Sequence, residues 1–154
     1  MTVNNLADAI SYYESMSAGR VVWDEGIAFA RARGLVYAEM WCRGERLLAL
    51  YHGGSWDELE READLVSRWV EEHGGGQLEV FAHVYQANVQ VHRGSLASAA
   101  GHVTALLPRA RESGDPQVLF RVLRPLRWSP LPKGTGAGRT STSPSSSGSP
   151  GRGR

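Results

Sequence analysis

Apolar residues recur at intervals of three and four from the start of the chain to about residue 125. Within residues 36–51 this spacing is followed by Tyr37, Met40, Trp41, Leu47, Leu48 and Tyr51. Such spacing places side chains on one side of an α-helix. The alternation typical of strands is weak, and no Asn-Gly or Asp-Gly hairpin turn occurs. The pattern predicts an all-α fold.

The helical pattern repeats every 40 residues. Gly34, Gly74 and Gly114 lie at this interval, and each ends a charged amphipathic run. The segments HGGSW (52–56) and HRGSL (92–96) lie at the same interval. A fixed interval of this kind is typical of stacked helical hairpins, in which each hairpin buries its apolar stripe against its neighbours. We therefore expect a solenoid of about three helix-turn-helix hairpins.

Seven helices are predicted, of which the outer two are short. Their expected limits are about Leu6–Tyr13, Ser17–Arg33, Val36–Tyr51, Ser55 to Gly74, Leu78–Val91, Leu96 to just before Gly114, and Pro116–Arg124. Ser55 and Glu58 form a predicted capping box at the start of the fourth helix. Pro108 predicts a bend, because an interior proline costs roughly 3 kcal/mol. Asp115 and Pro116 are typical of a helix start.

The composition changes abruptly after residue 125. Residues 129–154 consist almost entirely of Ser, Gly, Pro, Thr and Arg. Such a segment cannot offset its own ordering entropy. We therefore divide the chain into a helical array, residues 1–125, and a disordered tail, residues 126–154. Two origins of the tail stay open: an authentic extension, or a frameshifted or truncated reading frame that cuts the array within a unit.

Charge is distributed unevenly along the chain. Seven of the 17 basic residues follow Asp115, whereas none of the 16 acidic residues does, so the first 115 residues carry 10 basic and 16 acidic residues, a net charge of −6. An array this acidic is poorly suited to a phosphate backbone, and we expect no specific nucleic-acid binding. No apolar stretch approaches the roughly 18 residues of a membrane span. With no secretory signal and a single cysteine, Cys42, a cytoplasmic protein is expected.

Three runs in the sequence carry a resemblance to a known family. NLADAISYYESMSAGRVVWDEGIAFARARGL, LLALYHGGSWDELEREADLV and GDPQVL resemble the tetratricopeptide-like helical region of large bacterial regulators. In those proteins the region follows a signal-transducing ATPase module, often with a nucleotide-cyclase or helix-turn-helix output domain. The resemblance covers about residues 5–122 and implies a fragment of a larger regulator. Trp41, Gly44 and Ala63 roughly occupy signature positions, but the period exceeds the standard one of about 34 residues.

No group of residues predicts catalysis, a cofactor or a metal. None of the five histidines belongs to an HExxH motif. Cys42 lies in an apolar stretch without an activating base. The acidic cluster between Asp57 and Asp64 is expected to form a solvated helix face, paired locally with Arg61. Neither glycine run, 74–76 or 134–138, has the features of a phosphate-binding loop, so no enzyme activity is expected.

A non-catalytic protein-interaction or regulatory module is the function that these features favour. A partner protein or peptide is expected in a concave groove formed by the first helix of each hairpin. The residues predicted to contact it are Tyr37, Trp41, Glu45, Tyr85 and Asn88. The alternative is a truncated or frameshifted product with no independent function. Because neither end of the array has a polar capping helix, self-association through these ends is also expected.

Overall fold

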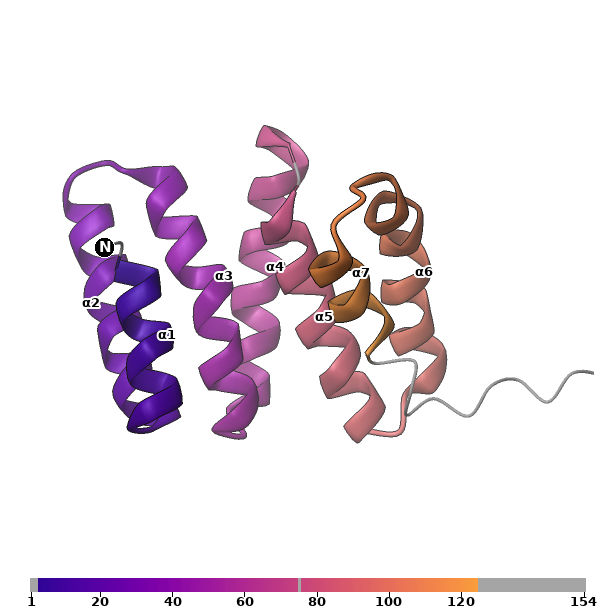
Figure 1. Cartoon of the computed structure of the whole chain (residues 1–154), viewed down its shortest axis with the longest axis horizontal. Helices are drawn as coiled ribbons and strands as arrows, with labels where there is room; N and C mark the ends of the chain where they lie inside the picture. The colour runs from indigo at the N-terminus through magenta and orange to yellow at the C-terminus, as the bar shows by residue number, and fades with distance from the viewer. Residues whose placement is uncertain (1–2, 75, 125–154) are drawn as a thin grey trace, which may run out of the picture.

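The computed structural model of the chain describes residues 3–74 and 76–124. Seven helices and no strand occur in these residues, which confirms the all-α prediction. The helices are α1 (Val3–Tyr13), α2 (Met16–Ala32), α3 (Val36–His52), α4 (Trp56–His73), α5 (Gln77–His92), α6 (Leu96–Glu112) and α7 (Pro116–Leu123). They follow one another in a row (Figure 1). The predicted tail, residues 126–154, lies outside the described residues.

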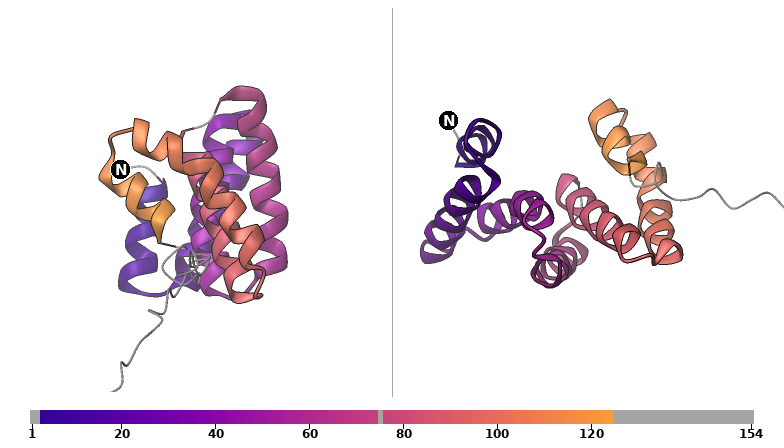
Figure 2. Two further views of the ribbon diagram at one scale, coloured as in Figure 1. Left: turned by 90° about the vertical axis from the view of Figure 1, so that its right-hand side faces the viewer. Right: turned by 90° about the horizontal axis from the view of Figure 1, so that it is seen from below.

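The row has an inner and an outer side. The odd-numbered helices α1, α3, α5 and α7 contact one another in order. In contrast, no Cα atom of α2, α4 or α6 lies within 8 Å of a Cα atom of another of these three helices, within the described parts of the chain. Seen from below, the row is curved, with α1 and α7 on the same side (Figure 2). The odd-numbered helices therefore form the inner side.

Glycines at the predicted interval close the turns between helices. Gly34, Gly54, Gly94 and Gly114 have φ values of 68°, 72°, 77° and 63°, a left-handed conformation in which a Cβ is unfavourable. After the first three of these glycines, the next amide donates to the carbonyl five residues earlier, at 2.8–3.0 Å. These bonds satisfy carbonyls at the helix ends that have no partner within the helix.

Gly44 has a different role, because it lies inside α3 where α5 crosses. A Cβ built on Gly44 would lie 2.7 Å from Cδ2 of Leu78 and 3.4 Å from Cδ2 of Phe81. The first distance is too short for a Cβ contact, whereas the second is an ordinary van der Waals distance. The missing side chain therefore allows the two inner helices to approach closely.

The helix starts correct one prediction and confirm another. Ser55 precedes α4 as expected, but its side chain makes no capping hydrogen bond, and Glu58 pairs with Arg20 of α2 instead. The capping-box prediction is therefore wrong, since the Glu58 side chain is used between helices. α7 begins at Pro116 as predicted. Pro108 lies inside α6, which continues to Glu112, and its last turns lean away from the direction of its first turns (Figure 1).

Apolar side chains fill the space between successive helices. The largest of those that are fully buried are Trp23, Leu47, Leu50, Leu59, Leu78 and Leu106. Each buried side chain of this size contributes about 1.5–3 kcal/mol relative to an exposed one. Among the described helices, none combines the length and the apolar character needed to cross a membrane.

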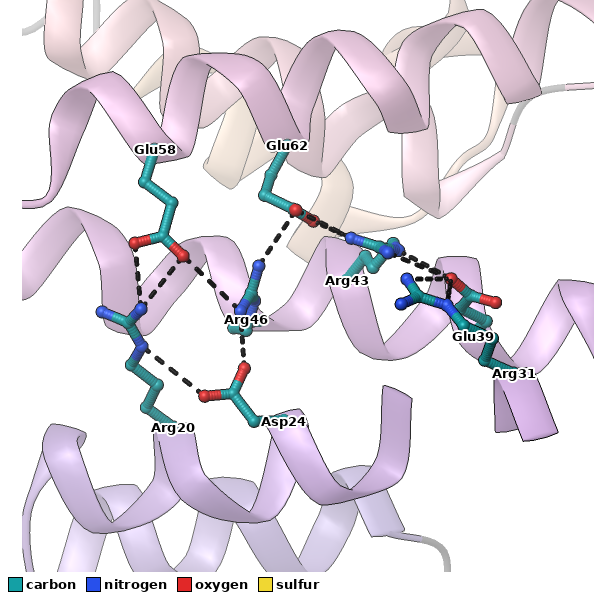
Figure 3. Close-up of polar contacts among 8 residues, drawn as sticks. All are labelled: Arg20, Asp24, Arg31, Glu39, Arg43, Arg46, Glu58 and Glu62. Carbon is teal, nitrogen blue, oxygen red and sulfur yellow. Dashed lines mark hydrogen bonds and ion pairs between the residues drawn. The ribbon is translucent and has the colours of Figure 1, made fainter. Parts of the chain in front are cut away.

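Two arginines of α3 are buried between α2 and α4 (Figure 3). The side chains of Arg43 and Arg46 are only 9% and 10% exposed. Arg43 donates to both oxygens of Glu62 on α4, at 2.7 and 2.6 Å, and Arg46 lies 3.1 Å from Glu62. Glu39 accepts from Arg43 at 3.1 Å. Burial of the Glu39 carboxyl opposes its ionisation, but hydrogen bonds from Arg31 and Arg43 outweigh this and lower its pKa.

The same network joins α2 to α4, whose backbones stay apart. Arg20 of α2 donates to Glu58 of α4 at 2.9 Å, and Asp24 of α2 accepts from Arg46 at 2.5 Å. The expectation of a solvated acidic face paired with Arg61 is therefore wrong for Glu58 and Glu62. These carboxylates point inward because the neighbouring helix buries arginines that need a counter-charge.

One period later, the corresponding positions hold a titratable pair instead of an ion pair. His83 of α5 lies 40 residues after Arg43, and His102 of α6 lies 40 residues after Glu62. Their Nδ1 atoms are 3.0 Å apart. Such a contact needs one nitrogen to donate and the other to accept, so it holds only while at least one ring is neutral. Burial lowers the pKa of both imidazoles.

Glu62→Gln is expected to destabilise the fold by about 3 kcal/mol, because Arg43 and Arg46 would stay buried without their shared carboxylate. Chemical denaturation followed by circular dichroism measures this loss. The matched control is Asp57→Asn on the same helix, whose exposed carboxylate pairs with Arg93 and should contribute far less. Equal losses for the two variants would contradict the structural role assigned to the buried network.

The contribution of the His83–His102 pair to the free energy of unfolding should fall as the pH drops below about 6.5. In the unfolded chain both imidazoles then bind protons, whereas burial disfavours their charged forms in the fold. Each extra proton bound on unfolding contributes at most about 1.4 kcal/mol per pH unit. Charges facing the pair come from Asp64, Glu60, Glu71, Glu79 and Arg109. Denaturation at several pH values should show that His83→Gln/His102→Gln removes this component, whereas His52→Gln keeps it. An unchanged pH slope in the double variant would refute the assignment.

Candidate partner-binding face

The inner face is the surface of α1, α3, α5 and α7 on the inner side of the row. Residues of α3 and α5 reach it at equivalent positions 40 apart, such as Trp41 with Phe81 and Glu45 with Tyr85. On α3 these positions lie opposite Arg43 and Arg46, which are directed toward α2 and α4 (Figure 3). The inner face is thus free of the structural ion pairs of α3.

One hollow on the inner face, hereafter the N-terminal cavity, lies between α1, the end of α2 and α3. Its volume is about 740 Å³. The side chains that give it chemical character are those of Asp8, Phe29, Tyr37, Trp41, Cys42 and Glu45. No basic residue belongs to its lining among the described residues. A cavity of this size, mostly apolar with a few polar groups, is suited to holding part of a ligand.

Aromatic rings continue from this cavity toward α5. The ring centroids of Tyr37 and Trp41 are 6.0 Å apart, and those of Trp41 and Phe81 are 6.2 Å apart. The Tyr37 side chain is 60% exposed although its ring also lies 5.8 Å from that of Trp69. Rings at these separations attract one another weakly. An exposed ring held in place by its neighbours can contact a partner at little entropic cost.

Two smaller cavities lie farther along the inner face, where α5 faces α7. Their volumes are about 210 and 370 Å³, and both are lined by Asn88 and Arg124. Tyr85 lines the smaller one. In the larger one, Tyr51 Oη lies 2.8 Å from His92 Nε2. This end of the inner face therefore carries hydrogen-bonding groups and positive charge.

Opposite charges face each other across the inner side. Asp8 on α1 and Glu45 on α3 supply carboxyl groups, and Arg121 on α7 is close enough to influence both electrostatically. Burial, then the charge of Asp8, raises the pKa of Glu45 to about 7, although Arg121 acts in the opposite direction. Burial likewise raises the pKa of Asp8 against the effect of Arg121. Neither carboxyl has a hydrogen bond or ion pair within the described chain.

The pKa values of two protic side chains on this face are raised. Burial, then the charge of Glu45, raises the pKa of the Cys42 thiol, which is the opposite of what a nucleophilic cysteine requires. Burial raises the pKa of Tyr85 to about 12, so its hydroxyl keeps its proton. No group of three or more His, Cys, Asp or Glu side chains in the described chain is arranged to hold a metal ion.

The five residues predicted to bind a partner divide between the two ends of the inner face. Tyr37, Trp41 and Glu45 line the N-terminal cavity, whereas Tyr85 and Asn88 line the cavities near α7. Asn88 is only 8% exposed. That these residues contact a partner stays a prediction.

Three charged residues of the inner face were not predicted from the sequence: Asp8, Arg121 and Arg124. The 40-residue interval could have found all three, because Asp8 lies 40 positions before Leu48, and Arg121 and Arg124 lie 40 positions after Phe81 and Val84. Leu48, Phe81 and Val84 all line a cavity of the inner face. The missed residues belong to the short outer helices α1 and α7 or, for Arg124, directly follow α7.

The chain matches no protein-family model, no curated protein and no solved structure.

The Glu45 carboxyl should titrate near pH 7, because burial and the Asp8 charge disfavour its ionised form. Carbon-13 NMR of the side-chain carboxyl measures this directly. Asp8→Asn should lower the Glu45 pKa by removing the neighbouring negative charge, whereas Asp57→Asn on α4 should leave it unchanged. Titration in the ordinary range of about 4.3 would show that the cavity is well hydrated and would contradict this description.

Proposed function

We propose that the chain is a non-catalytic, tetratricopeptide-like helical-repeat module that binds a protein or peptide partner on its inner face. The observation that carries this proposal is the N-terminal cavity, where an exposed tyrosine, a half-buried tryptophan and an unpaired carboxyl share one hollow. We further propose that the module serves a signalling or transcriptional regulator in the cytoplasm, as its resemblance to the helical regions of large bacterial regulators implies.

The repeated architecture supports the proposal. Glycine turns with positive φ recur at the 40-residue interval, and the positions of Arg43 and Glu62 recur as His83 and His102, again in contact across a helix pair. Repeats of this kind stack each hairpin on its neighbour and expose an extended concave surface, which they use for binding. The odd-numbered helices provide such a surface here.

Self-association is a second mode of interaction that the ends of the row favour. Phe120 and Leu123 of α7 are 71% and 41% exposed, and Leu6 of α1 is 41% exposed. Apolar side chains exposed at both ends of a stacked array favour contacts with another copy. None of these three residues lines the N-terminal cavity.

Random linear peptides displayed on phage and selected against the immobilised full chain test the proposed function. We expect selected peptides to bind with affinities measurable by isothermal titration calorimetry. Tyr37→Ala should weaken binding about tenfold, or about 1.4 kcal/mol, because an aromatic side chain that lines a binding cavity is a typical hot spot.

The matched control is Tyr13→Ala, which removes an exposed tyrosine outside the lining of the cavity and should leave the affinity unchanged. Sedimentation velocity of the same samples separates peptide binding from self-association. Equal effects of the two substitutions, or no selected peptide although circular dichroism shows the folded helices, would argue against the inner face as a binding surface.

A further inference from the structure

The charge of the N-terminal cavity selects among partners. Asp8 and Glu45 line it together, and none of its other described lining residues is basic. The nearest influence of opposite sign on both carboxyls comes from Arg121. Arg121 forms no ion pair with either carboxylate in the described chain, and its guanidinium lies 4.9 Å from the centroid of the Phe81 ring. The negative charge of the cavity therefore has no direct partner within the described residues.

The walls around these carboxyls suit a cationic group. Tyr37 and Trp41 line the same cavity as Asp8 and Glu45, and the faces of such rings attract a guanidinium or an ammonium group. The chain already contains this interaction at the rim, where the guanidinium of Arg33 lies 3.6 Å from the centroid of Phe29. The ring of Phe29 already contacts a cation, so the rings of Tyr37 and Trp41 are those available for a cation–π contact with a ligand.

The rim of the cavity is apolar. Val3, Leu35 and Tyr37 are 41%, 47% and 60% exposed, and all of them line the cavity. Val36, next to them in sequence, is 50% exposed. A bare cation would leave these side chains in water, whereas a peptide with apolar residues beside its basic side chain would cover them.

From this complementarity we propose that the N-terminal cavity binds an arginine or lysine side chain of a partner peptide, flanked by apolar residues. The proposal rests on the proposed function and specifies its ligand class. The basic group pairs with Glu45 and Asp8, its alkyl stem lies against Trp41 and Tyr37, and the flanking residues cover the apolar rim. A charge-assisted pair of this kind is stronger than a neutral hydrogen bond.

Protonation of Glu45 gives the interaction a pH dependence. Only the carboxylate pairs with a cation, and the pKa of Glu45 is raised to about 7, so affinity should rise as the pH increases from 6 to 8. The titratable and charged groups that face Glu45 are Asp8 from α1, Cys42 from α3, Tyr85 from α5 and Arg121 from α7. Of these, Cys42 and Tyr85 have raised pKa values and stay neutral over this range.

Peptide arrays test the proposal with the full chain as the labelled probe. Acetylated and amidated peptides carry Arg, Lys, citrulline, norleucine or Glu at one central position, within otherwise identical apolar and polar flanks. We expect the chain to prefer Arg and Lys over citrulline about tenfold or more. Glu45→Gln should abolish this preference and its rise with pH.

Glu45→Gln should not destabilise the fold, because burial already disfavours the charged form of this side chain and glutamine is a neutral isostere. The control is Glu112→Gln, which removes an exposed carboxylate from the end of α6 and tests for non-specific attraction by net charge. Circular dichroism verifies the fold of both variants.

The outcomes separate the two proposals. If peptides bind without a preference for Arg or Lys, or if the preference survives Glu45→Gln, the proposal of a cationic ligand is overturned. The proposed function then stays intact. If no peptide binds, both proposals fail. Equal affinity for free arginine amide and for the peptide would overturn a peptide as the occupant. Occupancy of the cavity by a segment of this chain would also overturn a partner peptide as the occupant. It would appear, without any added peptide, as NMR shifts around Trp41 that depend on Glu45. These shifts would change with protein concentration only if the segment comes from a second copy.

Discussion

Two buried arginines on one side of α3 constrain how α2, α3 and α4 are arranged. A charge removed from water is tolerated only when it is paired and hydrogen-bonded, so Arg43 and Arg46 require carboxylates from their surroundings. Glu62 and Glu58 of α4 and Asp24 of α2 provide them. Because the backbones of α2 and α4 do not approach each other, these side chains set the distance and the axial alignment between the outer helices. The apolar core supplies the stabilisation, and the ion network fixes the arrangement.

The second period solves the same packing problem with less charge. Gln86 stands 40 residues after Arg46 and donates to Asp64 of α4 at 2.8 Å, whereas His83 and His102 replace the arginine–glutamate pair. Neutral groups cost less to bury than ions. The histidine pair, however, holds only while at least one ring is neutral, and burial lowers the pKa of both rings. The two halves of the array therefore share one geometry and differ in how they respond to pH.

The division of α3 into two sides connects the structural network to the inner face. Charged residues directed toward α2 and α4 form ion pairs, whereas Glu45 and Asp8 on the inner side form none in the described chain. Burial without a partner raises the pKa of Glu45 to about 7, an unfavourable state that a cationic ligand would relieve. An unpaired carboxyl beside aromatic rings costs some stability, and under the proposed function it would help to discriminate between ligands.

The sequence by itself determined the helices, their order and the turns, because these depend on local spacing: apolar residues at threes and fours, and glycines that adopt positive φ at a 40-residue interval. It also placed Tyr37, Trp41 and Glu45 on one helix face. The roles of Glu58 and Glu62 were decided only by the tertiary structure, since a capping or solvated carboxylate and one that pairs with a buried arginine look alike in a sequence. The same holds for the pairing of His83 with His102 and for the joining of Asp8 to Glu45. Each depends on which helices lie side by side, and charge alone contains no information about distance across the fold.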